Sequence, residues 1–464
     1  MNKQKLKLIA FAAIAASGSM SSVYAADWPS GFSKCADEGE VCKVGDKALQ
    51  VSFGLKNKWV VKSLSGNVSC NAASFGVAAT ADIKEKCAIG PAGTPDNGTG
   101  SGTGGGTGGN TGGSTGDGSG TGSTPAGHSG GFAGLVTGGG TVAAVTVSTA
   151  AQMQAAIDAY SGTGGLVIRY TGTFDFRTIP DACTQWKKAK GAIVEIKNKG
   201  NVTIEGSNGS AANFGIAVKG GATNIIIRNM TIGLLPGSID AIGIEGQSGK
   251  FPGYVWVDHN TLFSSLAECP GAGDLEFDGL VDNKADAHHL TYSYNYIHDH
   301  HKVGLIGSSD SDASDRYITF HHNYYKNVGS RLPLQRGGYT HIYNNLYSDI
   351  KTSGINVRML GYSLIESNYF ENSQNPVTSR DSDVLGYWEL RNNNIKTPAD
   401  FNTYGIKWVA SDSKHTRDAT DWVTTSHLPI GIAYSYTPDE PACLKQKLPA
   451  VAGAGTSLAK LSCK

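Results

Sequence analysis

The sequence predicts an all-β chain whose main domain is a right-handed parallel β-helix. The chief observation is a repeated motif, Asn followed by any residue and then an apolar or aromatic residue, that closes successive β-rich segments. It starts at Asn260, Asn295, Asn323, Asn345, Asn368 and Asn393, which are 35, 28, 22, 23 and 25 residues apart. A regular period with one strand-rich unit per repeat is typical of a solenoid. A β-sandwich is the alternative, but it would not give this repeat.

Three further elements follow from local patterns. The segments Ile225–Ile227 and Val255–Val257 are predicted strands that stack in register, with the asparagines bonding to the turns above and below. Thr149–Ala159 has apolar residues at helical spacing, which predicts a short helix. The longest interval, from Asn260 to Asn295, predicts an inserted loop, and long loops on a rigid scaffold are common places for functional sites.

Composition divides the chain into four parts. Residues 1–25 have a lysine-rich start, a short apolar run and a small-residue cleavage site, which predicts a secretory signal peptide. Residues 26–90 form a small cysteine-containing module, and residues 91–130 form a Gly/Ser/Thr-rich linker that should behave as a flexible coil. Residues 131–464 form the β-helix domain. The protein is therefore expected to be secreted and extracellular.

The cysteine count agrees with export. Of the eight cysteines, four precede the glycine-rich tract and four follow it. An even count in an oxidising compartment favours disulfides within each domain, and the sequence leaves their connectivity open. A zinc site is the alternative, but the chain has no CxxC motif.

The small module is predicted to be a disulfide-bonded β unit. Val51–Phe53 and Trp59–Val61 are expected to be short strands around a turn. Its aromatic residues either form its only core or stack on sugar rings. Secreted enzymes that attack insoluble polysaccharide often have such a layout, so a carbohydrate-binding role is possible by analogy.

The overall charge narrows the choice of partners. The formal net charge is zero, which gives no general attraction to nucleic acid or to an anionic membrane. We therefore expect no nucleic-acid partner and no membrane partner. The protein is also expected to be a monomer. Any attraction to a polyanion must come from a local patch.

Acidic residues around the long interval point to a cation. If Asp278–Lys284 is extended, Asp278, Asp282 and Lys284 share one face, and Asp240 comes from an earlier repeat. Oxygen ligands alone favour calcium or magnesium. Asp278-Gly279 can also be read simply as a turn.

Basic residues point to an anionic ligand. Arg331 and Arg336 flank a Leu-Pro-Leu segment, and Lys284 and Lys302 precede them. A guanidinium matches a carboxylate with two parallel hydrogen bonds. The alternative is ordinary surface salt bridging.

The same segments carry a family resemblance. They are Tyr254–His259, Asp278–Lys284, Thr291–Asn295, His301–Gly307, Arg331–Gly338, Asn356–Arg358 and Pro376–Arg380. In this order they resemble the extracellular pectate lyases of polysaccharide lyase family 1, which are calcium-dependent β-helix enzymes. The resemblance covers most of residues 131–464 and leaves out the first 130.

The resemblance implies roles for individual positions. Asp240, Asp278 and Asp282 match Ca²⁺ ligands, although family members often have Glu at the position of Asp278. Many also have Asp at the position of Ser238, so an additional ligand is missing here. Further positions match the catalytic base (Arg331), its catalytic neighbour (Lys302), the groups that hold substrate carboxylates (Lys284, Lys302 and Arg336) and two disulfides (Cys183–Cys269 and Cys443–Cys463).

The expected activity is cleavage of 1,4-linked polygalacturonate, the pectin of plant cell walls, by Ca²⁺-assisted β-elimination to 4,5-unsaturated ends. The base must remove the C5 proton, whose acidity rises when the neighbouring carboxylate is neutralised. Because an arginine normally stays protonated, with a pKa above ~12, we expect an alkaline optimum. The alternatives are a pectin lyase acting on methylated substrate, a hydrolytic polygalacturonase and a non-catalytic pectin-binding protein.

Overall fold

The computed structural model describes residues 32–55, 58–75, 84–90, 127–188, 191–271 and 277–463. The predicted signal peptide and residues 91–126 of the predicted linker lie outside these ranges. The chain divides into two compact units, Met1–Gly116 and Asp117–Lys464, and each is described by itself.

The N-terminal unit contains an antiparallel sheet with strand order β1-β4-β2-β3. Its elements are β1 (Ser33–Asp37), β2 (Val41–Leu55), β3 (Lys58–Ser69), α1 (Ala72–Phe75) and β4 (Lys86–Ile89). The expected short strands are thus the ends of two much longer ones. Phe53 and Phe75 are buried, with ring centroids 5.2 Å apart, so these two aromatic residues form core and do not face a ligand. Disulfides join Cys35 to Cys42 and Cys70 to Cys87.

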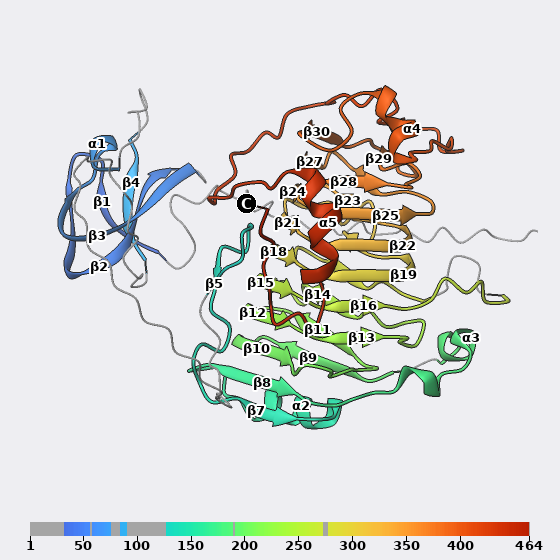
Figure 1. Ribbon diagram of the computed structural model, residues 1–464. Coiled ribbons are helices and arrows are strands. Elements are labelled where there is room, and N and C mark those ends of the chain that lie inside the picture. Colours follow the sequence, from blue (N-terminus) through green and yellow to red (C-terminus); the bar gives the residue numbers. More distant parts are fainter. Residues whose placement is uncertain are drawn as a thin grey trace, which may run out of the picture. The chain divides into compact units, whose positions relative to one another are not determined.

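The larger unit is a stack of coils, each of which contributes strands to neighbouring sheets (Figure 1). The first sheet consists of β7 (Val145–Val147), β8 (Leu166–Tyr170), β10 (Gly200–Gly206), β12 (Thr223–Arg228), β15 (Gly253–Asp258), β18 (His288–Ser293), β21 (Tyr317–His321), β24 (Tyr339–Tyr343), β27 (Tyr362–Glu366) and β30 (Tyr387–Arg391). The second consists of β9 (Ile193–Lys197), β11 (Gly215–Lys219), β14 (Ile242–Glu245), β17 (Val281–Lys284), β20 (Leu305–Ile306), β23 (Leu334–Arg336), β26 (Ile355–Arg358), β29 (Val377–Ser379) and the antiparallel β31 (Arg417–Asp418). The third consists of β13 (Thr231–Gly233), β16 (Thr261–Phe263), β19 (Tyr296–Lys302), β22 (Tyr324–Ser330), β25 (Leu346–Ile350) and β28 (Tyr369–Glu371).

These sheets confirm the predicted parallel β-helix. Ile225 of β12 pairs with Val255 of β15 in parallel, and the two following pairs keep the same register. Alternate residues of each strand point into the solenoid, where aliphatic and aromatic side chains form one continuous buried core.

The predicted asparagine stack is also present. From Asn295 onward, each Asn side chain accepts hydrogen bonds from the previous Asn and donates to a backbone carbonyl of the preceding coil. All but the last also donate to the next Asn: Asn323 Nδ2, for example, lies 2.9 Å from both Tyr292 O and Asn345 Oδ1. The ladder runs through Asn260, Asn295, Asn323, Asn345, Asn368 and Asn393, all of them buried. It satisfies the backbone groups at the turn between the first and third sheets, which explains why this residue recurs.

Helices cover the edges of the stack. The predicted helix is α2 (Ala150–Ala159): the Thr149 side chain caps it by accepting from Gln152 N, and Met153 and Ile157 bury its apolar side against the first coils. The chain also forms α3 (Ala182–Trp186), α4 (Phe401–Tyr404), α5 (Pro441–Val451) and the short 3-10 turns Phe176–Thr178 and Pro398–Asp400. Leu444 and Leu448 of α5 pack on Leu346 and Tyr369.

Residues just before the expected domain boundary belong to this unit. Gly127–His128 (β5) pairs with Leu135–Val136 (β6), and the Ser129 hydroxyl lies 3.1 Å from Thr291 Oγ1 on the first sheet. The linker therefore ends before residue 127, because this segment is held by the outer face of the sheet.

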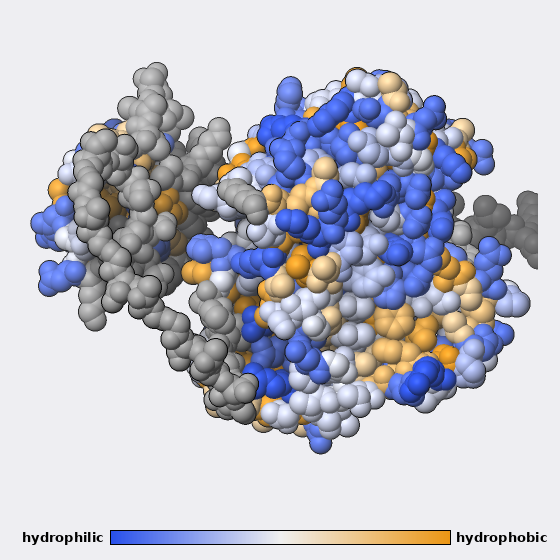
Figure 2. Space-filling view, in the orientation of Figure 1, coloured by the Kyte–Doolittle hydropathy of each residue, from blue (hydrophilic) through white to orange (hydrophobic). Residues whose placement is uncertain are grey.

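The visible surface is mostly hydrophilic, with one apolar region (Figure 2). On the face seen in Figure 2, apolar surface gathers over the coils that carry β13 and β16, while most of the remainder is hydrophilic. Among the described residues no helix has the length and apolar character needed to cross a bilayer.

Candidate active site

Successive coils bring the predicted site residues to one corner, where the third sheet passes into the second. Backbone hydrogen bonds join the coils at this corner: Ala241 N donates to Gly279 O at 3.3 Å, Leu280 N to Val303 O at 2.7 Å and Gly304 N to Arg331 O at 3.0 Å. These bonds involve Arg331 and the close sequence neighbours of Asp240, Asp278 and Lys302. The corner therefore carries Asp240, Asp278, Lys302 and Arg331 on neighbouring coils.

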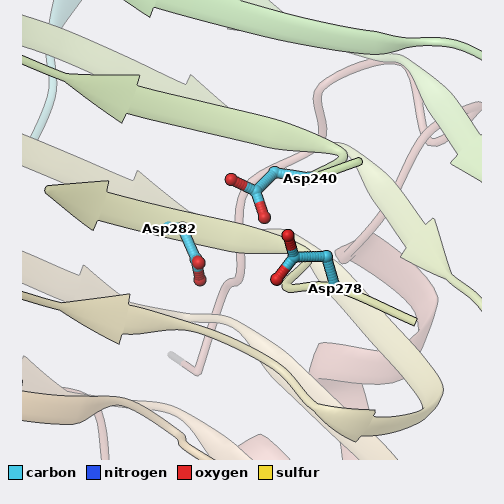
Figure 3. Close-up of side chains that lie close together, drawn as sticks. All are labelled: Asp240, Asp278 and Asp282. Carbon is cyan, nitrogen blue, oxygen red and sulfur yellow. The ribbon is translucent and has the colours of Figure 1, made fainter. Parts of the chain in front are cut away.

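The three acidic side chains converge. Ligand oxygens of Asp240, Asp278 and Asp282 all lie within 4.8 Å of one another. Figure 3 shows the carboxylates pointing toward a common space, with Asp282 on β17 and the other two on the loops that precede strands. Only Asp282 and Lys284 lie in a strand, so the expectation that Asp278 shares an extended face with them is wrong. Asp278 reaches the cluster from the corner. Gly279 leaves room there for the Asp282 carboxylate, because a Cβ at Gly279 would lie 2.3 Å from Asp282 Oδ1.

Burial and mutual repulsion make these acids hard to ionise together. Burial, reinforced by the charges of Asp282 and Asp278, raises the pKa of Asp240 to about 8. Burial also raises the pKa of Asp282, although Lys284 opposes this. The pKa of Lys284 is itself raised: burial would lower it, but the Asp282 and Asp240 carboxylates outweigh burial. The cluster thus carries more negative charge than its one close lysine offsets.

The donor set fits a hard cation. Lys284 Nζ lies 3.1 Å from Asp240 Oδ2 and 3.0 Å from Asp282 Oδ2. Asp240 Oδ1 is buried and has no hydrogen-bond partner among the described residues. A buried, unpartnered carboxylate oxygen beside two further carboxylates is what an oxygen-binding divalent cation would satisfy.

Basic side chains follow the second sheet beyond the acids. Arg336 on β23 pairs in register with Arg358 on β26, and Arg336 Nε donates to Asp310 Oδ1 at 2.8 Å. Burial, together with the charges of Arg336 and Arg331, lowers the pKa of Arg358 to about 10 against the opposing Asp381. Such crowding of cations favours an anionic ligand.

Arg331 occupies an unusual backbone conformation. Its φ is +67°, in the left-handed region that most side chains avoid, and it lies directly after β22. Residues held in such conformations are often found where function fixes a side chain. Here the conformation turns the chain at the corner that also carries Lys302, which pairs in register with Ser330.

The disulfides of this unit have the pairing that the resemblance implies. Cys183 on α3 is joined to Cys269, and Cys443 on α5 to Cys463. The first bond ties α3 to the chain segment that leads to Asp278. All eight cysteines of the chain lie within the described residues, and none is free.

Comparisons with known proteins decide the family. A family model described as pectate lyase matches residues 119–457. The chain belongs to the pectate lyase family. Pectate lyase B of Dickeya chrysanthemi is 45% identical over 349 residues, which cover 70% of this chain and 91% of that protein. This membership makes the chain a polysaccharide lyase, and the N-terminal β unit lies outside the matched residues.

Solved structures of pectate lyases are also similar. Pectate lyase II from Xanthomonas campestris has 52% identity and a TM-score of 0.68, covering 73% of this chain and 100% of its own. Pectate lyase C from Erwinia chrysanthemi, studied with Ca²⁺, has 44% identity and a TM-score of 0.67, covering 72% of this chain and 98% of its own. A mutant of pectate lyase C was determined in complex with pentagalacturonic acid.

Sequence reasoning missed several residues of this pectate lyase site. Arg358 lies within a segment that carries the resemblance but received no role, and only its register with Arg336 reveals it. Asp310, the partner of Arg336, comes from a loop whose path the sequence did not predict. Trp186, Lys187 and Lys188 also line a pocket beside Asp278, and the signal for them was the basic pair after an aromatic residue close to Cys183.

Proposed function

We propose that this protein is a secreted, Ca²⁺-dependent pectate lyase that cleaves polygalacturonate by β-elimination. The observation that carries the proposal is the cluster of Asp240, Asp278 and Asp282, with a buried unpartnered oxygen, at the corner that also carries Lys302 and Arg331. The Ca²⁺ and pentagalacturonic acid named for pectate lyase C support the same cation and substrate here.

Asp240, Asp278 and Asp282 would hold the cation. When bound there, Ca²⁺ neutralises a substrate carboxylate and so makes the neighbouring C5–H bond more acidic. Lys284, Lys302 and Arg336 bind carboxylates of the uronate chain through charge-assisted hydrogen bonds and fix its position along the corner. The Asp310 carboxylate orients Arg336 for this role, since it accepts from Nε and leaves other guanidinium N–H groups for substrate.

Arg331 is the proposed base. A neutral guanidine takes the C5 proton, the C5–H electron pair forms the C4–C5 double bond, and the C4–O bond breaks with its electrons on the leaving oxygen, which water protonates. The products are a new chain end and a 4,5-unsaturated galacturonate. Neighbouring cations make loss of a proton from a guanidinium less costly, and Lys302 and Arg358 are close to this corner.

Two features support export. Residues 1–25 have the composition of a signal peptide, and four disulfides use all eight cysteines. The acid cluster also favours pectate over methylated pectin as substrate, because a methyl ester removes the carboxylate charge that a cation and lysines bind.

The test is the ultraviolet absorbance of the unsaturated uronate, measured with de-esterified polygalacturonate at alkaline pH, with calcium and again with excess chelator. We expect a rise that the chelator abolishes and added calcium restores. A rise that survives chelation would indicate a metal-independent pectin lyase and remove the role of the acids. New reducing ends without a rise in absorbance would indicate a hydrolase. The absence of both new reducing ends and absorbance would indicate a binding protein.

A further inference from the structure

A pocket of about 500 Å³ opens beside the acid cluster, and Trp186, Lys187 and Lys188 in its lining have no part in the proposed chemistry. Its lining includes Trp186, Lys187, Lys188, Ser238, Asp278 and Lys302. Asp278 belongs also to the acid cluster, and Ser238 lines a second hollow together with Asp240 and Asp282. The pocket therefore adjoins the acid cluster of the proposed site.

The pocket wall is fixed to the loop that leads to Asp240. Gly237 N donates to Trp186 O at 3.2 Å, and a Cβ at Gly237 would lie 2.4 Å from Trp186 Cδ1, so only glycine allows the indole to lie this close. Trp186 also packs with Cys269 and Phe277, next to the Cys183–Cys269 disulfide. The position of the Trp186–Lys188 segment relative to the acids is thus set by packing and by a covalent bond.

The charge of the pocket identifies its ligand. Lys187 and Lys188 are exposed, and together with Lys302 they give the pocket lining three lysines against one carboxylate, Asp278. In the proposed function Asp278 binds a cation, so its negative charge does not offset the lysines. The pocket lining therefore has an excess of positive charge. Trp186 adds an apolar ring surface, which packs well against the C–H face of a sugar. A hexuronate offers both a carboxylate and such a face.

We infer that this pocket is an additional uronate-binding subsite, in which Lys187 and Lys188 bind the carboxylate of a galacturonate beyond those held by Lys284, Lys302 and Arg336. The identity of its ligand, a galacturonate, rests on the proposed function. It acts on affinity for longer chains and on positioning along the cleft, and it takes no part in proton transfer. Lys187 and Lys188 are specificity-determining residues for chain length and for free carboxylates.

The decisive variant is Lys187→Ala/Lys188→Ala, compared with the matched control Lys326→Ala/Lys460→Ala, which removes the same charge from exposed lysines that do not line this pocket. With long de-esterified oligogalacturonates the first variant should raise KM about three- to tenfold, the size expected for two exposed charge pairs, with kcat within about twofold. The increase should vanish for the shortest oligomer that the wild type cleaves and for highly methylated chains. Lys187→Arg/Lys188→Arg should restore the wild-type KM.

A second readout needs no turnover. In excess chelator, calorimetric titration with a long oligogalacturonate should give a Kd about three- to tenfold higher for the alanine variant than for the wild type or the control. An unchanged Kd and KM, an equal change in the control, or failure of the arginine variant to restore binding would overturn the subsite. Absence of lyase activity in the wild type would instead overturn the proposed function, and the titration would still test the pocket.

Discussion

Asp240→Asn tests the electrostatics of the acid cluster without using activity. In the protein free of calcium, burial and the neighbouring acids raise the pKa of Asp240 from 3.8 to about 8. A raised pKa means that the folded state keeps a proton that the unfolded chain has already lost. The free energy of unfolding should therefore fall as the pH rises from about 4, where the unfolded carboxyl ionises, to about 8, where the folded one does.

The magnitude follows from the shift. About four pKa units at ~1.4 kcal/mol each amount to roughly 6 kcal/mol of stability lost by pH 9. Movement of Lys284, whose side chain is 22% exposed, offsets part of this, so we expect a net loss of about 2–5 kcal/mol. Asn cannot ionise, so Asp240→Asn should be more stable than the wild type at pH 9 in chelator and similar at pH 5.

The assay is thermal unfolding followed by circular dichroism between pH 5 and pH 9, in chelator and in excess calcium. The expected result is a Tm of the chelated wild type that falls with pH more steeply than that of Asp240→Asn. Asp412→Asn, an exposed acid, serves as the control and should follow the wild type. Calcium should reverse the loss in the wild type and stabilise Asp240→Asn less. Parallel pH profiles for wild type and Asp240→Asn in chelator would refute the reasoning.

Three further outcomes are expected. Arg331→Lys keeps a charge but loses the planar guanidine, so it should lower kcat by at least about 100-fold and leave the circular dichroism spectrum unchanged. Near wild-type turnover in this variant would show that Arg331 is not the base, and so would a wild-type rate that peaks at mildly acidic pH. Asn323→Ala removes buried hydrogen bonds to Tyr292 O and Asn345 Oδ1, so it should lower the free energy of unfolding in urea by about 3 kcal/mol. The exposed control Asn402→Ala should lower it by less than about 0.5 kcal/mol, and equal effects would mean that the ladder does not stabilise the stack. Deletion of residues 26–90 should leave activity on soluble polygalacturonate unchanged and weaken retention on plant cell walls, as a pull-down would measure; a loss of soluble activity would contradict an accessory role.

Much of the β-helix could be predicted because its signals are local. The Asn motif recurs once per coil, and its side chains satisfy the same turn in each coil, so the period in the sequence is the period of the structure. The helix Ala150–Ala159 also followed from the spacing of its apolar residues, and the structure adds the Thr149 cap. In the N-terminal unit the same reasoning found strands but not their lengths, and it left open whether the aromatic residues were core.

The residues of the site could be named from the sequence, but their arrangement could not. The family resemblance, carried by segments such as Asp278–Lys284 and Arg331–Gly338, implied roles for seven residues: Asp240, Asp278, Asp282, Lys284, Lys302, Arg331 and Arg336. Register between coils decided that Asp240 meets Asp278 although 38 residues separate them, and that Arg358 stands beside Arg336. Packing of Trp186 on Gly237 decided where Lys187 and Lys188 lie. Hydrogen bonding and hydrophobic periodicity are local, within one coil, so they can be read along the chain. The charge around the pocket comes from residues on several coils, which only the stacking of the coils brings together.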